Sequence, residues 1–146
     1  MSDTARDTTP GGGTRTDPRA EDPRLWGRTY AIPFARVWDA AKGLADGGLR
    51  GWSMVRNDDR EGVIEAVSLT WFRRKPDQVT ITIRLDENAQ TRVDVRCVRS
   101  EGASARRRHP RLINGFLGAL DREIEATPGQ KLDPTATPGW QREEKR

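Results

Sequence analysis

The sequence predicts an α+β domain, in which two amphipathic helices cover one face of an antiparallel sheet of four or five strands in the chain order β-α-β-β-β-β-α. Three observations predict this fold. Nearly all aliphatic and aromatic residues lie between residues 25 and 126. Apolar and polar residues alternate over residues 79–85 and 93–97, as in strands with one buried face. Two further stretches, 34–45 and 112–124, repeat apolar residues at the spacing of a helix.

The composition divides the 146-residue chain into one domain and two tails. Hydrophobic residues make up 34% of the chain and charged residues 33%, and the mean hydropathy is -0.85. Residues 1–24 contain only Met1, Ala5 and Ala20 as apolar residues, and residues 128–146 are similarly poor. Such segments bury too little apolar surface to offset the entropy lost on ordering. We therefore predict a disordered arm over residues 1–24, a single domain over 25–127 and a disordered tail over 128–146.

The first elements of the domain are a short strand within residues 25–32 and a helix that follows Pro33. Proline suits the first position of a helix because its missing N–H would have no partner there. Gly47 and Gly48 are expected to end the helix, since glycine readily adopts the positive φ of a helix C-terminus. The helix carries one apolar stripe, formed by Phe34, Val37, Trp38, Ala41, Leu44 and Ala45.

Four more strands are predicted, over residues 52–56, 63–71, 79–85 and 93–97. Polar turns over residues 57–62, 73–77 and 86–90 separate them. Connections this short favour an antiparallel meander, because parallel strands need a longer crossover. The polar face of the last two strands carries Arg84, Arg92 and Arg96, with Asp94 among them.

The second helix is predicted to begin at Pro110, after a polar loop over residues 100–108, and to end near Thr127. One amphipathic stripe on each helix is enough to cover one face of the sheet. The stripe of this second helix is formed by Leu112, Ile113, Phe116, Leu117, Leu120 and Ile124.

The sequence holds few of the residues that bind metals or phosphate-bearing cofactors. It has one cysteine and one histidine, whereas zinc sites use several such residues. Asp58, Asp59 and Glu61 lack the spacing of a calcium loop and are interpreted as a solvated turn. No glycine run has the strand–loop–helix context of a phosphate-binding loop. We therefore expect no metal and no cofactor.

The single cysteine and the single histidine are interpreted as structural residues. Cys97 lies in register with the apolar residues of its strand, where burial makes a thiol unreactive. His109 stands at the predicted start of the second helix and has no acidic residue nearby except Glu101. Because the sequence shows no catalytic constellation, we expect a non-enzymatic protein. An enzyme of unknown type, with His109, Asp39 and Arg99 as its candidate residues, is a further hypothesis.

The leading hypothesis for function is an accessory or binding domain with a ligand groove between the helices and the sheet. Several large aromatic residues occur in this small domain, and such residues commonly line ligand pockets. The alternative is that they fill the core. The residues concerned are Trp38, Trp52, Trp71 and Phe116.

A competing hypothesis is binding of nucleic acid or of an anionic lipid surface through basic loops. The chain has a formal net charge of +4 and a pI near 9.8. Acidic and basic residues are otherwise mixed, which is typical of a solvated surface. The candidate anion contacts are Arg73, Arg74, Lys75, Arg99, Arg106, Arg107, Arg108 and Arg111.

The sequence also predicts where the protein resides. No apolar run is long enough for a transmembrane helix, and the N-terminal residues lack the apolar core of a secretion signal. A single cysteine provides no disulfide framework. These observations predict a cytoplasmic protein.

Part of the chain is similar to a known family. Residues 91–100 form a valine-rich strand that runs into Arg99 and Ser100, and the helix that follows reads RLINGFLGAL over residues 111–120. This succession resembles the end of the bacterial family called domain of unknown function 1499, and the resemblance spans Tyr30 to Glu125. It implies no known activity. The chain departs from the family's acid, glycine and asparagine at Ala105, Arg107 and His109.

Overall fold

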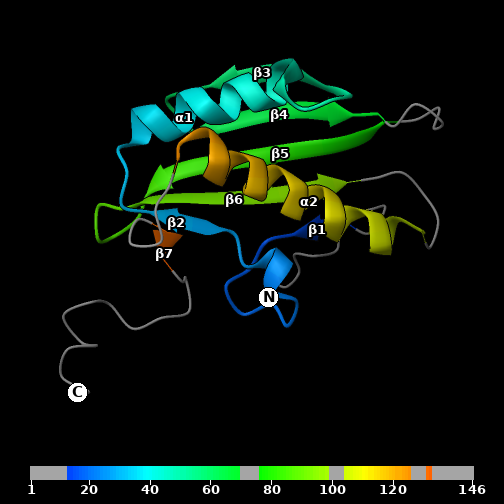
Figure 1. Ribbon diagram of the computed structural model, residues 1–146, viewed down its shortest axis with the longest axis horizontal. Coiled ribbons are helices and arrows are strands. Elements are labelled where there is room, and N and C mark those ends of the chain that lie inside the picture. Colours follow the sequence, from blue (N-terminus) through cyan, green and yellow to red (C-terminus); the bar gives the residue numbers. More distant parts are fainter. Residues whose placement is uncertain (1–12, 70–75, 99–103, 126–130, 133–146) are drawn as a thin grey trace.

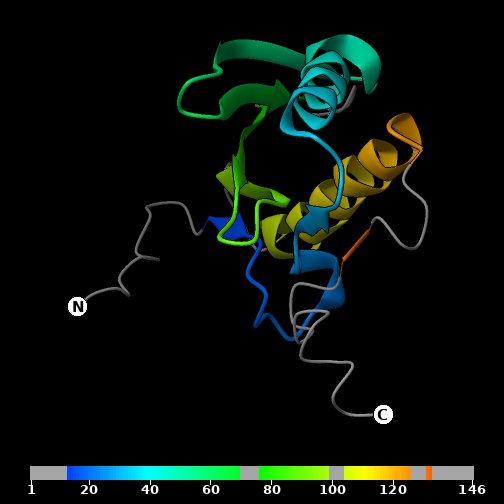
Figure 2. The ribbon, with the colours of Figure 1, turned by 90° about the vertical axis from the view of Figure 1, so that its left-hand side faces the viewer.

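The computed structural model describes residues 13–69, 76–98, 104–125 and 131–132, except for the side chains of 104–107 and 131–132. In this part of the chain seven strands form one sheet in the order β3-β4-β5-β6-β2-β7, with β1 beside β6. Each pair of neighbouring strands is antiparallel. Both long helices, α1 and α2, lie over the same face of the sheet (Figures 1 and 2). The predicted α+β fold is thereby confirmed.

The five predicted strands are present with shifted ends. Leu25, expected in the first strand, belongs instead to a single helical turn, η2 (Pro23–Leu25). Asp77, expected in a turn, begins a strand. The strands are β2 (Arg28–Tyr30), β3 (Trp52–Asp58), β4 (Val63–Ser68), β5 (Asp77–Leu85) and β6 (Thr91–Val98).

Two short strands come from the segments that the composition predicts to be disordered. β1 (Thr14–Arg15) pairs with β6, and β7 (Lys131–Leu132) pairs with β2. Residues 13–24 of the expected arm thus include a strand and hydrogen-bonded turns, whereas residues 1–12 lie outside the described residues. Ordering there comes from backbone hydrogen bonds to a strand edge, such as Thr16 N to Val95 O at 2.8 Å. The number of apolar residues in a segment does not predict stabilisation by backbone hydrogen bonds.

The first helix follows the sequence prediction closely. α1 (Phe34–Gly43) comes directly after Pro33 and continues into a wide helical turn, η3 (Leu44–Gly48). Gly47 has a φ of +104°, which confirms that a glycine in the left-handed region ends the helix. The helix buries Val37, Trp38 and Ala41 against the sheet.

The second helix begins earlier than predicted. α2 (Ser104–Glu123) includes Pro110 in its interior, so the prediction that the helix starts at this proline is wrong. The physical reason is tertiary, because the side chains of Arg108 and His109 bond Asp77 at the start of β5 and hold the first turns in place. The predicted end near Thr127 lies outside the described residues.

The other end of α2 is also fastened to the sheet by polar contacts. Tyr30 donates its hydroxyl proton to Asp121 at 2.5 Å, and the Nε of Arg28 lies 3.2 Å from the same carboxylate. Burial, followed by the hydrogen bond to Asp121, raises the pKa of Tyr30 far above its ordinary value. The phenol therefore remains a hydrogen-bond donor at physiological pH.

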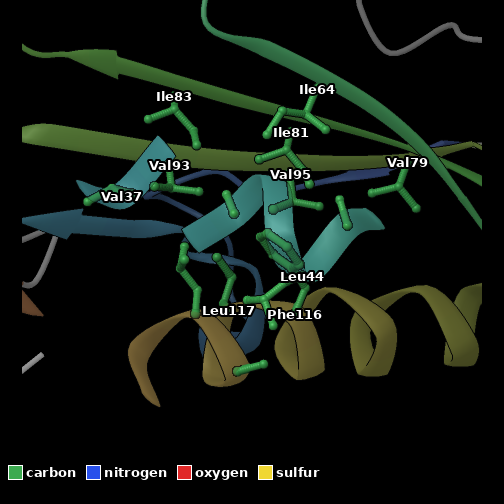
Figure 3. Close-up of a cluster of buried hydrophobic side chains, with 14 of the residues drawn as sticks. Val37, Leu44, Ile64, Val79, Ile81, Ile83, Val93, Val95, Phe116 and Leu117 are labelled. Carbon is green, nitrogen blue, oxygen red and sulfur yellow. The ribbon is translucent and has the colours of Figure 1, made fainter. Parts of the chain in front are cut away.

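The core lies between the helices and the sheet (Figure 3). In the central hairpin, Val79, Ile81 and Ile83 of β5 pair with Cys97, Val95 and Val93 of β6. All six side chains are buried on the helix side. Within the described residues, no helix has both the length and the apolar character needed to cross a membrane.

Candidate functional site

The candidate site lies on the sheet face that the helices leave open. The alternation that buries one face of β5 and β6 places polar residues on the other. Across the two strands Thr80 pairs with Arg96, Thr82 with Asp94, and Arg84 with Arg92. The open face therefore presents three successive cross-strand rows of threonine, aspartate and arginine.

These rows form the floor of a groove with a volume of about 440 Å³. That volume lies within the range of small-molecule sites. One wall is supplied by the N-terminal segment, residues 15–18, which runs beside β6 (Figure 2). The lining residues are Arg15, Thr16, Asp17, Pro18, Thr80, Thr82, Arg84, Arg92, Asp94, Val95 and Arg96.

Arg92 is the fixed part of the groove floor. Its guanidinium donates to both carboxylate oxygens of Asp94, at 3.0 and 2.7 Å. It also donates to the carbonyl of Trp26 at 2.8 Å and to the hydroxyl of Thr29 at 3.2 Å. Arg92 is only 8% exposed, and its charge and most of its hydrogen-bond donors are taken up by these contacts within the protein. Arg92 is therefore a structural cation, and Asp94 largely neutralises it.

Thr16 fixes the N-terminal wall to this floor. Its hydroxyl donates to Asp94 Oδ1 at 2.7 Å and accepts from the backbone N–H of Val95 at 3.0 Å. The side chain is nearly buried, at 7% exposed. The wall is therefore held by both backbone and side-chain bonds.

Gly27 lets the chain pass close to the Arg92–Asp94 pair. It has a φ of +81°, and a Cβ at this position would lie 2.7 Å from Arg92 Nη2 and 2.9 Å from the Val93 carbonyl oxygen. A side chain would therefore collide with the groove floor while the backbone was strained.

The remaining charges give the groove a positive balance. Four arginines and two aspartates line it, which is an excess of two positive charges. Arg15 and Arg84 are exposed and form no ion pair with any residue that the structure describes. A row of arginine and threonine side chains is well suited to an anion, because guanidinium groups and hydroxyls both donate hydrogen bonds.

A second polar cluster lies on the helix side of the sheet. Asp77 is buried and accepts two hydrogen bonds from Arg108, at 2.9 and 3.0 Å. His109 Nε2 lies 3.2 Å from the same carboxylate, and its Nδ1 lies 3.3 Å from the hydroxyl of Thr14. Burial alone would raise the pKa of Asp77, but the hydrogen bonds from His109 and Arg108 outweigh it and hold that pKa well below its ordinary value.

This second cluster links α2 to β5 and β1, and it offers no reactive group to solvent. His109 is fully buried and links α2 to β1, which supports its interpretation as a structural residue. Burial raises the pKa of Cys97 to about 12, so the thiol stays protonated and unreactive near neutral pH. Asp77, the partner of His109, is 32 residues away in the chain, and no local pattern pointed to it.

The predicted ligand-groove residues that the structure describes lie in the core. Trp38, Trp52 and Phe116 are all buried, and the rings of Trp52 and Phe116 stack at a centroid distance of 5.4 Å. This favours the alternative that these aromatics fill the core. Trp71 lies outside the described residues.

The predicted anion contacts are mostly not described. Arg73, Arg74, Lys75 and Arg99 lie outside the described residues, and Arg106 and Arg107 belong to α2 without described side chains. Arg108 is engaged with Asp77, and Arg111 is exposed on α2. Of the candidates for an enzyme, Asp39 is exposed on α1, whereas His109 is buried and contacts Asp77 and Thr14.

The groove includes residues that the sequence did not single out. The alternation in β5 and β6 places Thr80 and Thr82 beside the arginines, but nothing in the sequence indicated that residues 15–18 form a wall. Among the described residues no group of acidic, histidine and cysteine side chains is arranged to hold a metal ion. The chain matches no family model, no curated protein and no solved structure. The resemblance to the domain of unknown function 1499 family therefore stays a prediction.

Proposed function

We propose that this domain is a non-enzymatic binding module that holds a small anionic ligand in the groove on the open face of the sheet. The observation that carries the proposal is a 440 Å³ groove lined by four arginines and three threonines. Arg15 and Arg84 supply charge that no described residue neutralises. The neutral Arg92–Asp94 pair supplies a rigid floor.

The hydrogen bonds that the groove residues already make with each other favour a binding role over catalysis. Asp94 is the carboxylate nearest the middle of the floor, and it accepts from Arg92 and from Thr16. A carboxylate held in this way is a poor general base, because three of its roughly four lone-pair sites already accept hydrogen bonds. Arginine and threonine then contribute donors that orient a ligand without exchanging protons.

The hypothesis of surface binding through basic loops draws less support from the described residues. The charge of Arg108 is engaged with the buried carboxylate of Asp77. Arg111 belongs to α2, which covers the other face of the sheet, whereas the groove is lined by residues of the open face. The groove is therefore the better candidate for anion recognition.

The proposal is tested by titrating the ¹⁵N-labelled protein with inorganic phosphate at constant ionic strength and following backbone amide shifts by NMR. We expect saturable shifts at Thr80, Thr82 and Arg96. Arg15→Gln should weaken phosphate binding about tenfold, because one charge-assisted hydrogen bond is lost.

The matched control is Arg122→Gln, which removes the same charge from an exposed position on α2. We expect no change in phosphate affinity for this variant. Absence of saturable shifts at the groove amides would overturn the proposal. Equal weakening in both variants would also overturn it, because the response would then reflect net charge alone.

A further inference from the structure

We infer that residues 13–16 form a strap that opens without unfolding the sheet and closes when an anion occupies the groove. The strap comprises β1 and its two flanking residues, Gly13 and Thr16. Its opening depends on contacts of the strap itself, whereas its closing by a ligand rests on the proposed function.

The strap adds little apolar surface to the domain. Its sequence is Gly-Thr-Arg-Thr, without an aliphatic or aromatic side chain. Its strand, β1, has two residues and pairs with β6 alone among the described strands. Segments with few buried apolar contacts open at a much lower free energy than the core of a protein. The strap is therefore expected to open far more often than the whole domain unfolds.

Polar contacts hold the strap closed. The backbone N–H of Thr16 donates to Val95 O at 2.8 Å. The hydroxyl of Thr16 donates to Asp94 at 2.7 Å and accepts from the N–H of Val95 at 3.0 Å. At the other end the hydroxyl of Thr14 lies 3.3 Å from His109 Nδ1. Water can replace these partners at a small net cost, because folding only exchanges hydrogen bonds to water for internal ones.

Opening leaves no buried charge without a partner. Asp94 still accepts two hydrogen bonds from Arg92 after Thr16 departs, at 3.0 and 2.7 Å. His109 still contacts Asp77, which lies 3.2 Å from its Nε2. The strand β2, which pairs with the first residues of β6, is not part of the strap. The sheet and its core therefore keep their own contacts while the strap is open.

The strap ends just before Asp17, where the chain becomes fixed to the domain. The backbone N–H of Asp17 donates to Leu25 O at 2.6 Å, and Leu25 packs against the core. The carbonyl of Trp26 accepts from Arg92 at 2.8 Å. The loop over residues 17–27 therefore stays in place, and the bond rotations of opening fall immediately before Asp17.

The strap carries two of the residues that line the groove, Arg15 and Thr16. Both lie beside the groove floor only while β1 is paired with β6. A ligand that contacts the Arg15 guanidinium therefore binds the closed form more tightly than the open form, and it shifts the population toward the closed form. By the same linkage, an open strap lowers the apparent affinity of the groove.

Hydrogen exchange of the ¹⁵N-labelled full chain, followed by NMR, tests the strap without any ligand. The reporter is the amide of Thr16, bonded to Val95 O, and the reference is the amide of Ile83 in β5, bonded to Gly62 O at 2.7 Å. After correction for intrinsic rates, we expect Thr16 to exchange at least about a hundredfold faster than Ile83. Saturating inorganic phosphate, at constant pH and ionic strength, should slow Thr16 and leave Ile83 unchanged.

One variant loosens the strap. Thr16→Val removes the hydroxyl that bonds Asp94 and Val95 but keeps the backbone bond that is measured. The amide at position 16 should then exchange about tenfold faster, while Ile83 exchanges as before and shows that the sheet is retained. The matched control is Thr82→Val, which removes a hydroxyl from β5, separated from β1 by β6. This control should leave exchange at position 16 unchanged.

Exchange of Thr16 at the same rate as Ile83 would overturn the inference, because the strap would then open only when the domain unfolds. So would equal acceleration of both amides by Thr16→Val. If phosphate shifts the amides of Thr80, Thr82 and Arg96 but leaves the exchange of Thr16 unchanged, the proposed function stands and closing by the ligand is refuted. If those amides do not shift, the proposed function itself fails, whereas the opening of the strap is decided by the exchange measured without phosphate.

Discussion

Asp77 fastens the first turns of α2 to the sheet, and its replacement by asparagine tests that role. The carboxylate accepts two hydrogen bonds from Arg108 and one from His109. Asp77→Asn keeps the shape of the side chain but removes its charge and one acceptor atom. The new NH₂ group would face donors, so at least one buried hydrogen bond is lost.

The expected magnitude follows from how deeply the ion pair is buried. Removing one partner of a buried pair costs about 3–5 kcal/mol, because the other charge is left uncompensated. The side chain of Asp77 is 2% exposed and that of Arg108 is 19% exposed, so water reaches the remaining guanidinium. We therefore expect a loss of about 3 kcal/mol in the free energy of unfolding, at the lower end of that range. For a domain of this size the melting temperature should fall by about 12–24 °C.

The lowered pKa of the Asp77 carboxyl predicts that the stability of the protein depends on pH. The pKa of Asp77 is lower in the folded protein than in the unfolded chain. Its contribution is therefore complete above the unfolded pKa of about 3.9 and is lost as the pH falls toward the folded pKa. The difference in stability between the wild type and Asp77→Asn should shrink steadily below about pH 4.

The assay is urea unfolding followed by tryptophan fluorescence at neutral and acidic pH. The control is Arg56→Gln, which breaks an exposed ion pair with Glu65 at 2.9 Å. An exposed pair contributes about 0–1 kcal/mol, so this variant should unfold almost as the wild type does. A loss for Asp77→Asn no larger than that of the control at neutral pH would refute the reasoning. So would a difference that does not decline with acid.

Three further predictions concern the core, the groove floor and the thiol. Phe116→Ala should lower the free energy of unfolding by about 3–5 kcal/mol in urea, because the ring is fully buried; a loss below about 1 kcal/mol would contradict its place in the core. Gly27→Ala should reduce both stability and phosphate affinity, whereas Gly115→Ala, which has open space for a Cβ, should reduce neither; equal effects would contradict the close approach to the groove floor. Cys97 should resist iodoacetamide at pH 8 until urea unfolds the chain, since burial raises its pKa to about 12; rapid alkylation of the native protein would contradict this.

Local patterns were sufficient to predict the layers of this fold. The alternation along β5 and β6 identified a buried face, and Cys97 proved to be on it. The helical stripes of α1 and α2 identified what covers that face. The same alternation placed Arg84, Arg92 and Arg96 on the open face, although it could not show that they border a groove.

The sequence by itself identified most of the apolar core, because burial of one face leaves a periodic signature within a single element. Only the tertiary structure decided which elements meet. Asp77 reaches Arg108 across 31 residues and so extends α2 past the expected start at Pro110. Arg15 reaches Arg96 through strand pairing, which places a segment of disorder-like composition in the wall of the groove. These partners depend on strand register and on hydrogen bonds between distant residues, and neither leaves a periodic trace in the local sequence.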